Sequence, residues 1–234
     1  MNYSSVVFWV STILVLYIIY LYYMSINTPV VNSTTLTIQN ADVLIPANVN
    51  AASSRYSYGI WMYVNTWDNT VVKPIILRDQ TVPGAVPQIS IYLDKTSPIL
   101  WATIAPSNSG VVPPMSITDS FPIQKWTYVF VSVDTQYVDM YIDGKLVKSM
   151  KLPYIPAPPA INASPIHIGK GSDGRYVSSD VFLTKLQWWP SAFSPQAVWN
   201  EYLKGNNNSM FGWFPYTANV SISKGNVVQA SYTL

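Results

Sequence analysis

One uninterrupted apolar stretch, from Val6 to Met24, constrains the fold of this chain more than any other feature. It contains 19 residues without a charge, and only Ser11 and Thr12 interrupt the aliphatic and aromatic run. A helix rises about 1.5 Å per residue, so a stretch of this length spans the hydrocarbon core of a bilayer, which is about 30 Å thick. The sequence therefore predicts a transmembrane helix over residues 6–26.

Aromatic residues gather toward both ends of this stretch, as expected where rings meet the lipid headgroups. A cleaved signal peptide would need a basic start, a shorter apolar core and a small-residue cleavage site, and a buried core helix would show a polar face. Neither pattern occurs here. The residues expected to contact lipid are Phe8, Trp9, Leu14, Leu16, Ile18, Ile19, Tyr20, Tyr22 and Tyr23. The first charged residues, Asp42 and Arg55, lie too far away to predict the orientation of the anchor.

The rest of the chain has the composition of a β-rich domain. Aromatic residues make up 14%, prolines number 18, and Glu201 is the single glutamate. Residues 56–64 are apolar on both alternating faces, which is typical of an inner strand in a two-sheet sandwich. Other strands are predicted, between turns rich in proline and glycine, at 34–38, 43–45, 73–77, 88–93, 99–104, 126–133, 166–169, 181–189, 220–223 and 227–232.

A hairpin and a helix have the clearest local signals. Asp143-Gly144 separates the strands at 137–142 and 145–150, and this dipeptide tolerates the positive φ angles of a type I′ turn. Trp126 is expected in the core, at the start of the strand before the hairpin. The helix signals are an N-cap at Ser194, a proline at 195, an apolar stripe of Val198, Trp199, Tyr202 and Leu203, and a C-terminal Lys204 and Gly205.

Three segments occur in an order that resembles the laminin-G-like branch of the concanavalin A-like lectin/glucanase superfamily. They are KWTYVFVSVDTQYVDMYIDGKLVKS at 125–149, IHIGKG at 166–171 and VFLTKLQWWPSAFSPQAVWNEYL at 181–203. The resemblance covers about residues 40–205. It implies an all-β fold: a two-sheet antiparallel jelly-roll sandwich with one short helix. The expected organisation is a tail at 1–5, the transmembrane helix at 6–26, a linker at 27–40, the sandwich at 41–205 and a C-terminal extension of strands at 206–234.

The chain departs from the catalytic pattern of this superfamily. Its glucanases use closely spaced acidic residues on one strand, and retaining chemistry needs two carboxyl groups about 5–5.5 Å apart. Here Glu201 lies on the predicted helix, and no D-x-D or E-x-D occurs. Thr184 or Lys185 stands where the branch often has an acidic residue, which argues against an inherited metal site. We therefore expect no enzyme activity and no catalytic residues.

Candidate binding residues have alternative explanations. His167 is the sole histidine and is expected to be a strand residue with a hydrogen-bond partner, because no cysteine or second histidine could complete a metal site. Residues 169–174 lack the G-K-[ST] ending of a phosphate-binding loop and are expected to connect two strands. Oxygen ligands for Ca²⁺ could come from Asp68, Asn69, Asp119 and Asp173, although solvated turns explain these residues as well. Trp67 and Trp213, flanked by polar or turn residues, are the candidate glycan or partner contacts.

Two function hypotheses follow. The chain has no cysteine and is rich in asparagine and tyrosine, and in this it resembles minor structural proteins of large icosahedral DNA viruses with an internal membrane. This resemblance implies a non-enzymatic, membrane-anchored link between that membrane and the capsid. Its partners would be the lipid bilayer and other structural proteins. The alternative is a membrane-anchored, lectin-like glycan-binding or adhesion module at a cell surface. Charged residues are only 10% and the net charge is +2, without a basic run, so no nucleic-acid partner is expected.

Overall fold

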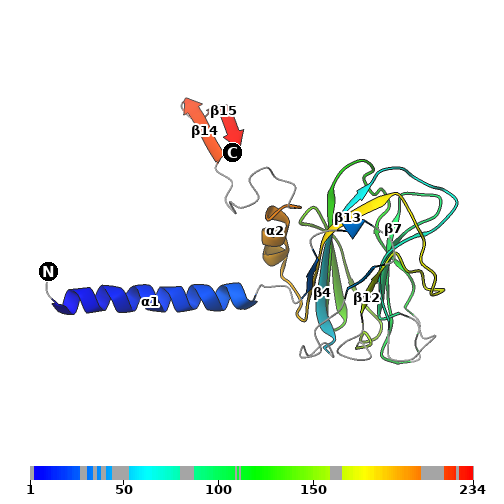
Figure 1. Ribbon diagram of the computed structural model, residues 1–234, viewed down its shortest axis with the longest axis horizontal. Coiled ribbons are helices and arrows are strands. Elements are labelled where there is room, and N and C mark those ends of the chain that lie inside the picture. The colour runs from blue at the N-terminus through cyan, green and yellow to red at the C-terminus, as the bar shows by residue number, and fades with distance from the viewer. Residues whose placement is uncertain are drawn as a thin grey trace.

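The computed structural model describes residues 3–26, 31–33, 36–37, 41–43, 53–79, 87–108, 110, 112–158, 165–206, 219–224 and 227–233. Two antiparallel sheets face each other and enclose a shared core, which confirms the predicted jelly-roll sandwich (Figure 1). A separate pair of strands, β14 (Asn219–Lys224) and β15 (Val227–Thr233), follows the sandwich as predicted.

The first sheet has seven strands in the order β1-β13-β4-β9-β10-β11, with β2 also paired to β13. Its bounds are β1 Val31–Ser33, β2 Leu36–Thr37, β4 Arg55–Val64, β9 Thr127–Asp134, β10 Tyr137–Ile142, β11 Lys145–Lys151 and β13 Val181–Trp189. The second sheet has six strands in the order β3-β12-β5-β6-β7-β8. Its bounds are β3 Ala41–Val43, β5 Lys73–Arg78, β6 Ile89–Leu93, β7 Leu100–Ile104, β8 Met115–Thr118 and β12 Ile166–Ile168.

The central strand β4 is buried on both faces, as its sequence predicts. Tyr58, Ile60 and Met62 enter the core between the sheets, while Trp61 joins a second aromatic cluster on the opposite face. Helix α2 (Pro195–Leu203) covers that second cluster, so the seven-stranded sheet is the middle layer between the core and the helix.

The predicted helix caps and hairpin turn are confirmed. The Ser194 hydroxyl accepts a hydrogen bond from the backbone N–H of Ala197, and Gly205 has a φ of 66° beyond the helix end. Asp143 and Gly144 have φ values of 49° and 72°, which fit the type I′ turn. In the helix, however, the predicted apolar stripe is incomplete, because Leu203 is 60% exposed and Glu201 is buried instead.

Three other features differ from the sequence-based expectation. Strand β1 lies within the range 27–40 that was expected to be a linker before the predicted strand at 34–38, because β13 pairs with β1 as well as with β2 along its outer edge. Strand β8 was not predicted. Trp126 is only half-buried, because it precedes β9 and packs against Tyr63 on the outer face of the sheet rather than between the sheets.

Strand β11 forms one edge of the seven-stranded sheet and has the sequence KLVKSMK. Its pairing with β10 is irregular opposite Met140 and Tyr141, where Val147 is the extra residue. The Lys148 ammonium donates to the carbonyl and hydroxyl oxygens of Ser116 at 3.0 and 3.2 Å. Since Ser116 lies on β8, the edge of the other sheet, this lysine joins the two sheet edges.

Helix α1 (Tyr3–Ile26) occupies the apolar stretch at the start of the chain. The large apolar side chains described on it, from Trp9 to Tyr20, are 53–64% exposed. Phe8, Tyr22 and Tyr23 have side chains outside the described residues. Judged on the described residues alone, no helix is long and apolar enough to cross a membrane.

Candidate functional site

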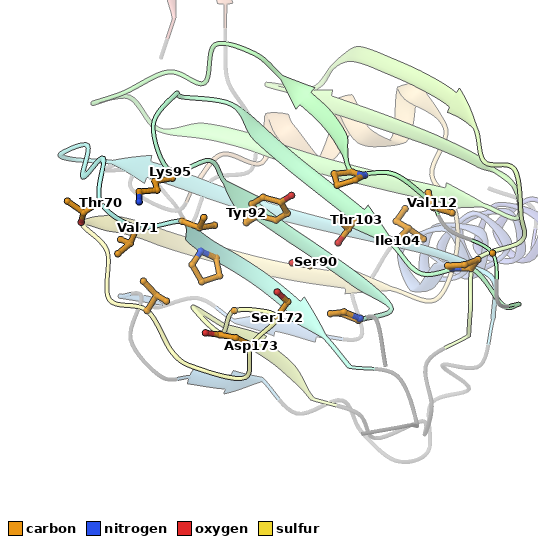
Figure 2. Close-up of a pocket in the computed structure, with 18 residues that line it drawn as sticks. Thr70, Val71, Ser90, Tyr92, Lys95, Thr103, Ile104, Val112, Ser172 and Asp173 are labelled. Atoms are coloured by element: carbon orange, nitrogen blue, oxygen red, sulfur yellow. The ribbon is translucent and has the colours of Figure 1, made fainter. Parts of the chain in front are cut away.

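A groove with a volume of about 980 Å³ lies on the outer face of the six-stranded sheet (Figure 2). Its floor consists of alternate residues of β6 and β7, namely Ser90, Tyr92 and Thr103. Ser90 pairs with Thr103 across the two strands, and Tyr92 pairs with Trp101, so these side chains share one face. The floor therefore combines two hydroxyl groups with a half-buried aromatic ring.

Loops from distant parts of the chain form the walls. Figure 2 shows Thr70, Val71 and Lys95 toward one end of the groove and Ile104 and Val112 toward the other, with Ser172 and Asp173 along one side. Most of the remaining lining is apolar or proline: Val72, Pro74, Pro87, Pro106, Gly110, Pro114, Gly171 and Val177. The groove thus offers a largely apolar enclosure above a polar floor.

A buried lysine fixes the end of the groove near Val71. The Lys73 ammonium donates to the carbonyl oxygens of Val71 at 3.1 Å, Asp94 at 3.3 Å and Lys95 at 3.4 Å. It also lies 4.0 Å from the centroid of the Trp67 ring. Burial lowers the pKa of Lys73, and the neighbouring Asp68 and Asp94 oppose this change. These contacts hold two groove-forming loops against each other.

The side wall is a loop that connects β12 to the next strand, as predicted for residues 169–174. His167 at its base is buried, and its Nε2 atom lies 3.0 Å from Asp79 Oδ2. The Lys170 ammonium donates to the same carboxylate oxygen at 3.2 Å, and the Tyr176 hydroxyl lies 3.4 Å from His167 Nδ1. The prediction that His167 is a strand histidine with a hydrogen-bond partner is confirmed, and the cluster anchors both ends of the loop.

The wall from Pro106 to Pro114 is supported by the segment after β11. Ser107 N–H donates to the carbonyl of Ile155 at 2.9 Å, and Ala157 N–H donates to the carbonyl of Ala105 at 2.8 Å. Gly110 faces the Tyr154 ring so closely that an added Cβ would lie 2.3 Å from a ring carbon. A side chain at this position would therefore force the loop or the Tyr154 ring to move.

Few charged residues line the groove. Among its lining residues, all of which are described, Lys95 is the one cation and Asp173 the one carboxylate. Asp173 Oδ1 accepts a hydrogen bond from the backbone N–H of Arg175 at 3.0 Å, which holds the carboxylate in its loop. The chemistry of the groove is therefore that of hydroxyl groups, one aromatic face and apolar walls.

The candidate glycan contacts and calcium ligands that the sequence indicated lie at different places in the fold. Trp67 is half-buried against the core and beneath the Lys73 ammonium, outside the groove lining, and Trp213 lies outside the described residues. Asp173 lines the groove, whereas Asp68 caps its own turn by accepting hydrogen bonds from Thr70, which lower its pKa. Within the described residues, no three potential His, Cys, Asp or Glu ligands gather around a common point.

The floor residues Ser90, Tyr92 and Thr103 were not predicted as a site. The available signal was the alternation of polar or aromatic residues with isoleucine and alanine in 88–93 and 99–104. That alternation identifies an outer face, but it does not reveal that loops 70–72, 106–114 and 171–177 enclose it.

A family model of the concanavalin A-like lectin/glucanases superfamily matches residues 37–198. The chain belongs to this superfamily. This membership agrees with the two-sheet sandwich and with the three sequence segments that resemble the laminin-G-like branch. No curated protein matches the chain in sequence.

Solved structures of low sequence identity share this fold. The complex of NanB with optactamide has a TM-score of 0.60 at 14% identity, and Trypanosoma rangeli sialidase with 2,3-difluorosialic acid has 0.54 at 15%. Each alignment covers 73% of this chain but only 27% of the other chain. A structure of botulinum neurotoxin type C, whose cell entry depends on two ganglioside molecules, has a TM-score of 0.56 at 16% identity, covering 77% and 52% of the two chains. At these identities the similarity establishes the fold alone.

Proposed function

We propose that this protein is a lectin-like module that binds glycans in the groove on its six-stranded sheet. The observation that carries the proposal is the floor, where the Tyr92 ring lies beside the hydroxyl groups of Ser90 and Thr103. An aromatic ring can pack on the apolar face of a pyranose while neighbouring hydroxyls bond to its edge. Membership of a lectin/glucanase superfamily and the ganglioside-dependent neurotoxin among the structural neighbours support this choice.

The groove suits an uncharged oligosaccharide. An acidic sugar would be expected to meet several cations, but only Lys95 lines the groove, and Asp173 opposes it in charge. The proline and valine walls instead favour sugars that carry apolar substituents, such as acetamido methyl groups. A volume of about 980 Å³ is large enough for a ligand of several sugar rings, since pockets of about 300–1,000 Å³ accommodate drug-sized ligands.

Replacing Tyr92 with alanine should weaken glycan binding about tenfold or more, because about 1.4 kcal/mol of lost contact corresponds to a factor of ten. A glycan array should first select a neutral ligand, and calorimetry should then compare the variants. Tyr137→Ala is the matched control, since Tyr137 is an exposed tyrosine on β10 of the other sheet. Equal affinities for the two variants, or no saturable binding to the full-length protein, would refute the proposal.

We also propose that the module does not hydrolyse its ligand. Retaining or inverting hydrolysis needs two carboxyl groups across a cleft, and Asp173 is the one carboxylate among the described residues that line the groove. Glu201 lies on the buried face of α2, which covers the opposite sheet. The glycans recovered from the binding experiment should therefore be intact by mass spectrometry.

The localisation that we propose is a membrane surface, with the N-terminal helix as the tether. The support is the uncharged run from Val6 to Met24 and the exposure of the apolar side chains described on α1. Deleting residues 1–26 should move the protein from the floating vesicle fraction to the soluble fraction in a flotation gradient. The truncated protein should keep a cooperative unfolding transition with a β-type circular dichroism spectrum, because none of the α1 side chains that the structure describes belongs to the sandwich core. Truncated protein that still floats with vesicles would contradict the tether.

A structural role in a larger assembly is the second candidate, and the same exposed helix favours it. In that case α1 and the weakly charged surface would contact other proteins, as in a minor virion component between an internal membrane and a capsid shell. Crosslinks from the native source to other structural proteins, together with absent glycan binding, would favour this role over the lectin.

A further inference from the structure

Arg78 at the end of β5 is fully buried between the two sheets, with an exposure of 0%. An irregularity in the pairing of β5 with β6, at Ile75, shifts the alternation of the strand. Arg78 consequently pairs with Ile89 and Ile166, whose side chains belong to the core. A strand-end arginine that would otherwise face solvent is thereby turned inward.

The guanidinium has only part of its bonding capacity filled. Its Nη1 atom donates to the Tyr58 hydroxyl at 3.4 Å, and its Cζ atom lies 4.9 Å from the centroid of the Trp188 ring. The Nε and Nη2 atoms, which form one edge of the guanidinium, are buried without a hydrogen-bond partner. This edge is the one that receives anions in a bidentate manner.

Other donors in the same part of the core also lack acceptors. The Tyr56 hydroxyl and the Trp188 Nε1–H are buried and unpartnered, and the Tyr56 ring packs edge-on against Tyr58. Burial raises the pKa of Tyr56, while the charge of Arg78 opposes this change, so the hydroxyl keeps its proton at neutral pH and remains a donor. The buried amide of Gln88 is unpartnered as well, but it is uncharged and cannot neutralise the guanidinium.

None of the acidic side chains that the structure describes pairs with Arg78. The adjacent Asp79 receives His167 and Lys170 on the outer face of the sheet. Every acidic residue except Asp42 has a described side chain, and none of those described bonds to Arg78. Asp42 stands opposite His167 in the β3–β12 register, whereas Arg78 stands opposite Ile166. A buried charge without a counter-charge is strongly unfavourable.

We propose that Arg78, Tyr56 and Trp188 form a binding site for a small monovalent anion between the sheets. The anion accepts hydrogen bonds from the free edge of the guanidinium, from the Tyr56 hydroxyl and from the Trp188 indole. It supplies the negative charge that no acidic side chain within the described residues brings to Arg78. The site is separate from the groove, so it stands independently of the glycan proposal.

Chloride is the probe for this site. In full-length protein at constant ionic strength, with sodium gluconate exchanged for sodium chloride, Tm should rise by about 3–6 °C for each tenfold increase in chloride above the dissociation constant. Arg78→Met should abolish this dependence. Arg55→Met is the matched control, because Arg55 is an exposed arginine that pairs with Asp134, and it should keep the chloride dependence of the native protein.

Two further measurements keep the proposal falsifiable if Arg78→Met does not fold. Tyr56→Phe removes one donor and keeps the ring, so it should weaken chloride binding about two- to tenfold. Crystals grown in sodium bromide should show an anomalous peak beside the Arg78 guanidinium. A Tm that does not change with chloride, or a water rather than a bromide at this position, would overturn the proposal.

Discussion

Replacing Trp189 with alanine should destabilise the domain by about 3–5 kcal/mol, the range for losing a fully buried large aromatic residue. Trp189 is 1% exposed, and its ring centroid lies 4.8 Å from that of Phe193 and 5.4 Å from that of Phe130. The cavity would open in the aromatic cluster that α2 covers. Urea unfolding followed by circular dichroism measures the change, and Tm should fall by about 10 °C.

Trp126→Ala is the matched control for this experiment. Trp126 is half-buried on the outer face of the same sheet, so its removal should cost about 1–2 kcal/mol. Equal losses for the two tryptophans would show that the aromatic cluster under α2 is not a separate region of tight packing.

The domain should lose stability steeply above pH 10. In an unfolded chain tyrosine ionises near pH 10, but burial raises the pKa of Tyr56, Tyr58 and Tyr128 in the folded protein. Their contribution to the free energy of unfolding is therefore fully present below pH 10, and it is lost as the pH rises toward the pKa values of the folded protein. Each of these tyrosines lowers the free energy of unfolding by about 1.4 kcal/mol per pH unit in this window, and the three together lower it by about 4 kcal/mol per pH unit.

A stability of about 5–15 kcal/mol would then be exhausted within about one to four pH units above pH 10. The buried Lys73 and Lys185 act in the opposite direction, because their lowered pKa values make stability rise with pH, but only up to about pH 10.5. Urea unfolding from pH 8 to 11.5 measures the slope. Tyr56→Phe should reduce the slope by about a quarter to a third, because burial also raises the pKa of Tyr141, to about 12, and an unchanged slope would contradict the assignment.

Local signals in the sequence were sufficient for much of the sandwich. The Asp143-Gly144 turn fixes the β10–β11 hairpin, and Ser194-Pro195 fixes the start of α2, because each needs only neighbouring residues. Strand β8 has four residues between the prolines of the preceding loop and Asp119, which is too short for a clear alternation. Its place is set by pairing with β7.

The groove and the buried arginine could not be predicted from short stretches of sequence, because both depend on residues that are far apart in the chain. The groove exists because three loops, each held by its own anchor at Lys73, His167 or Ile155, converge over β6 and β7. Arg78 enters the core because one irregular pairing at Ile75 reverses the alternation of β5. Such an irregularity depends on the partner strand, and its own residues give no sign of it.

The lysine-rich edge strand β11 determines how copies of this protein can coexist at high density. An open strand with free backbone groups is a template on which a neighbouring chain can add its own strand and begin aggregation. Here Lys145 and Lys151 bring like charges to any approaching copy, the extra residue Val147 disturbs the hydrogen-bonding register, and Lys148 is already bound to the other sheet. Many copies crowded on one surface would therefore remain separate, folded units rather than fuse into a continuous sheet.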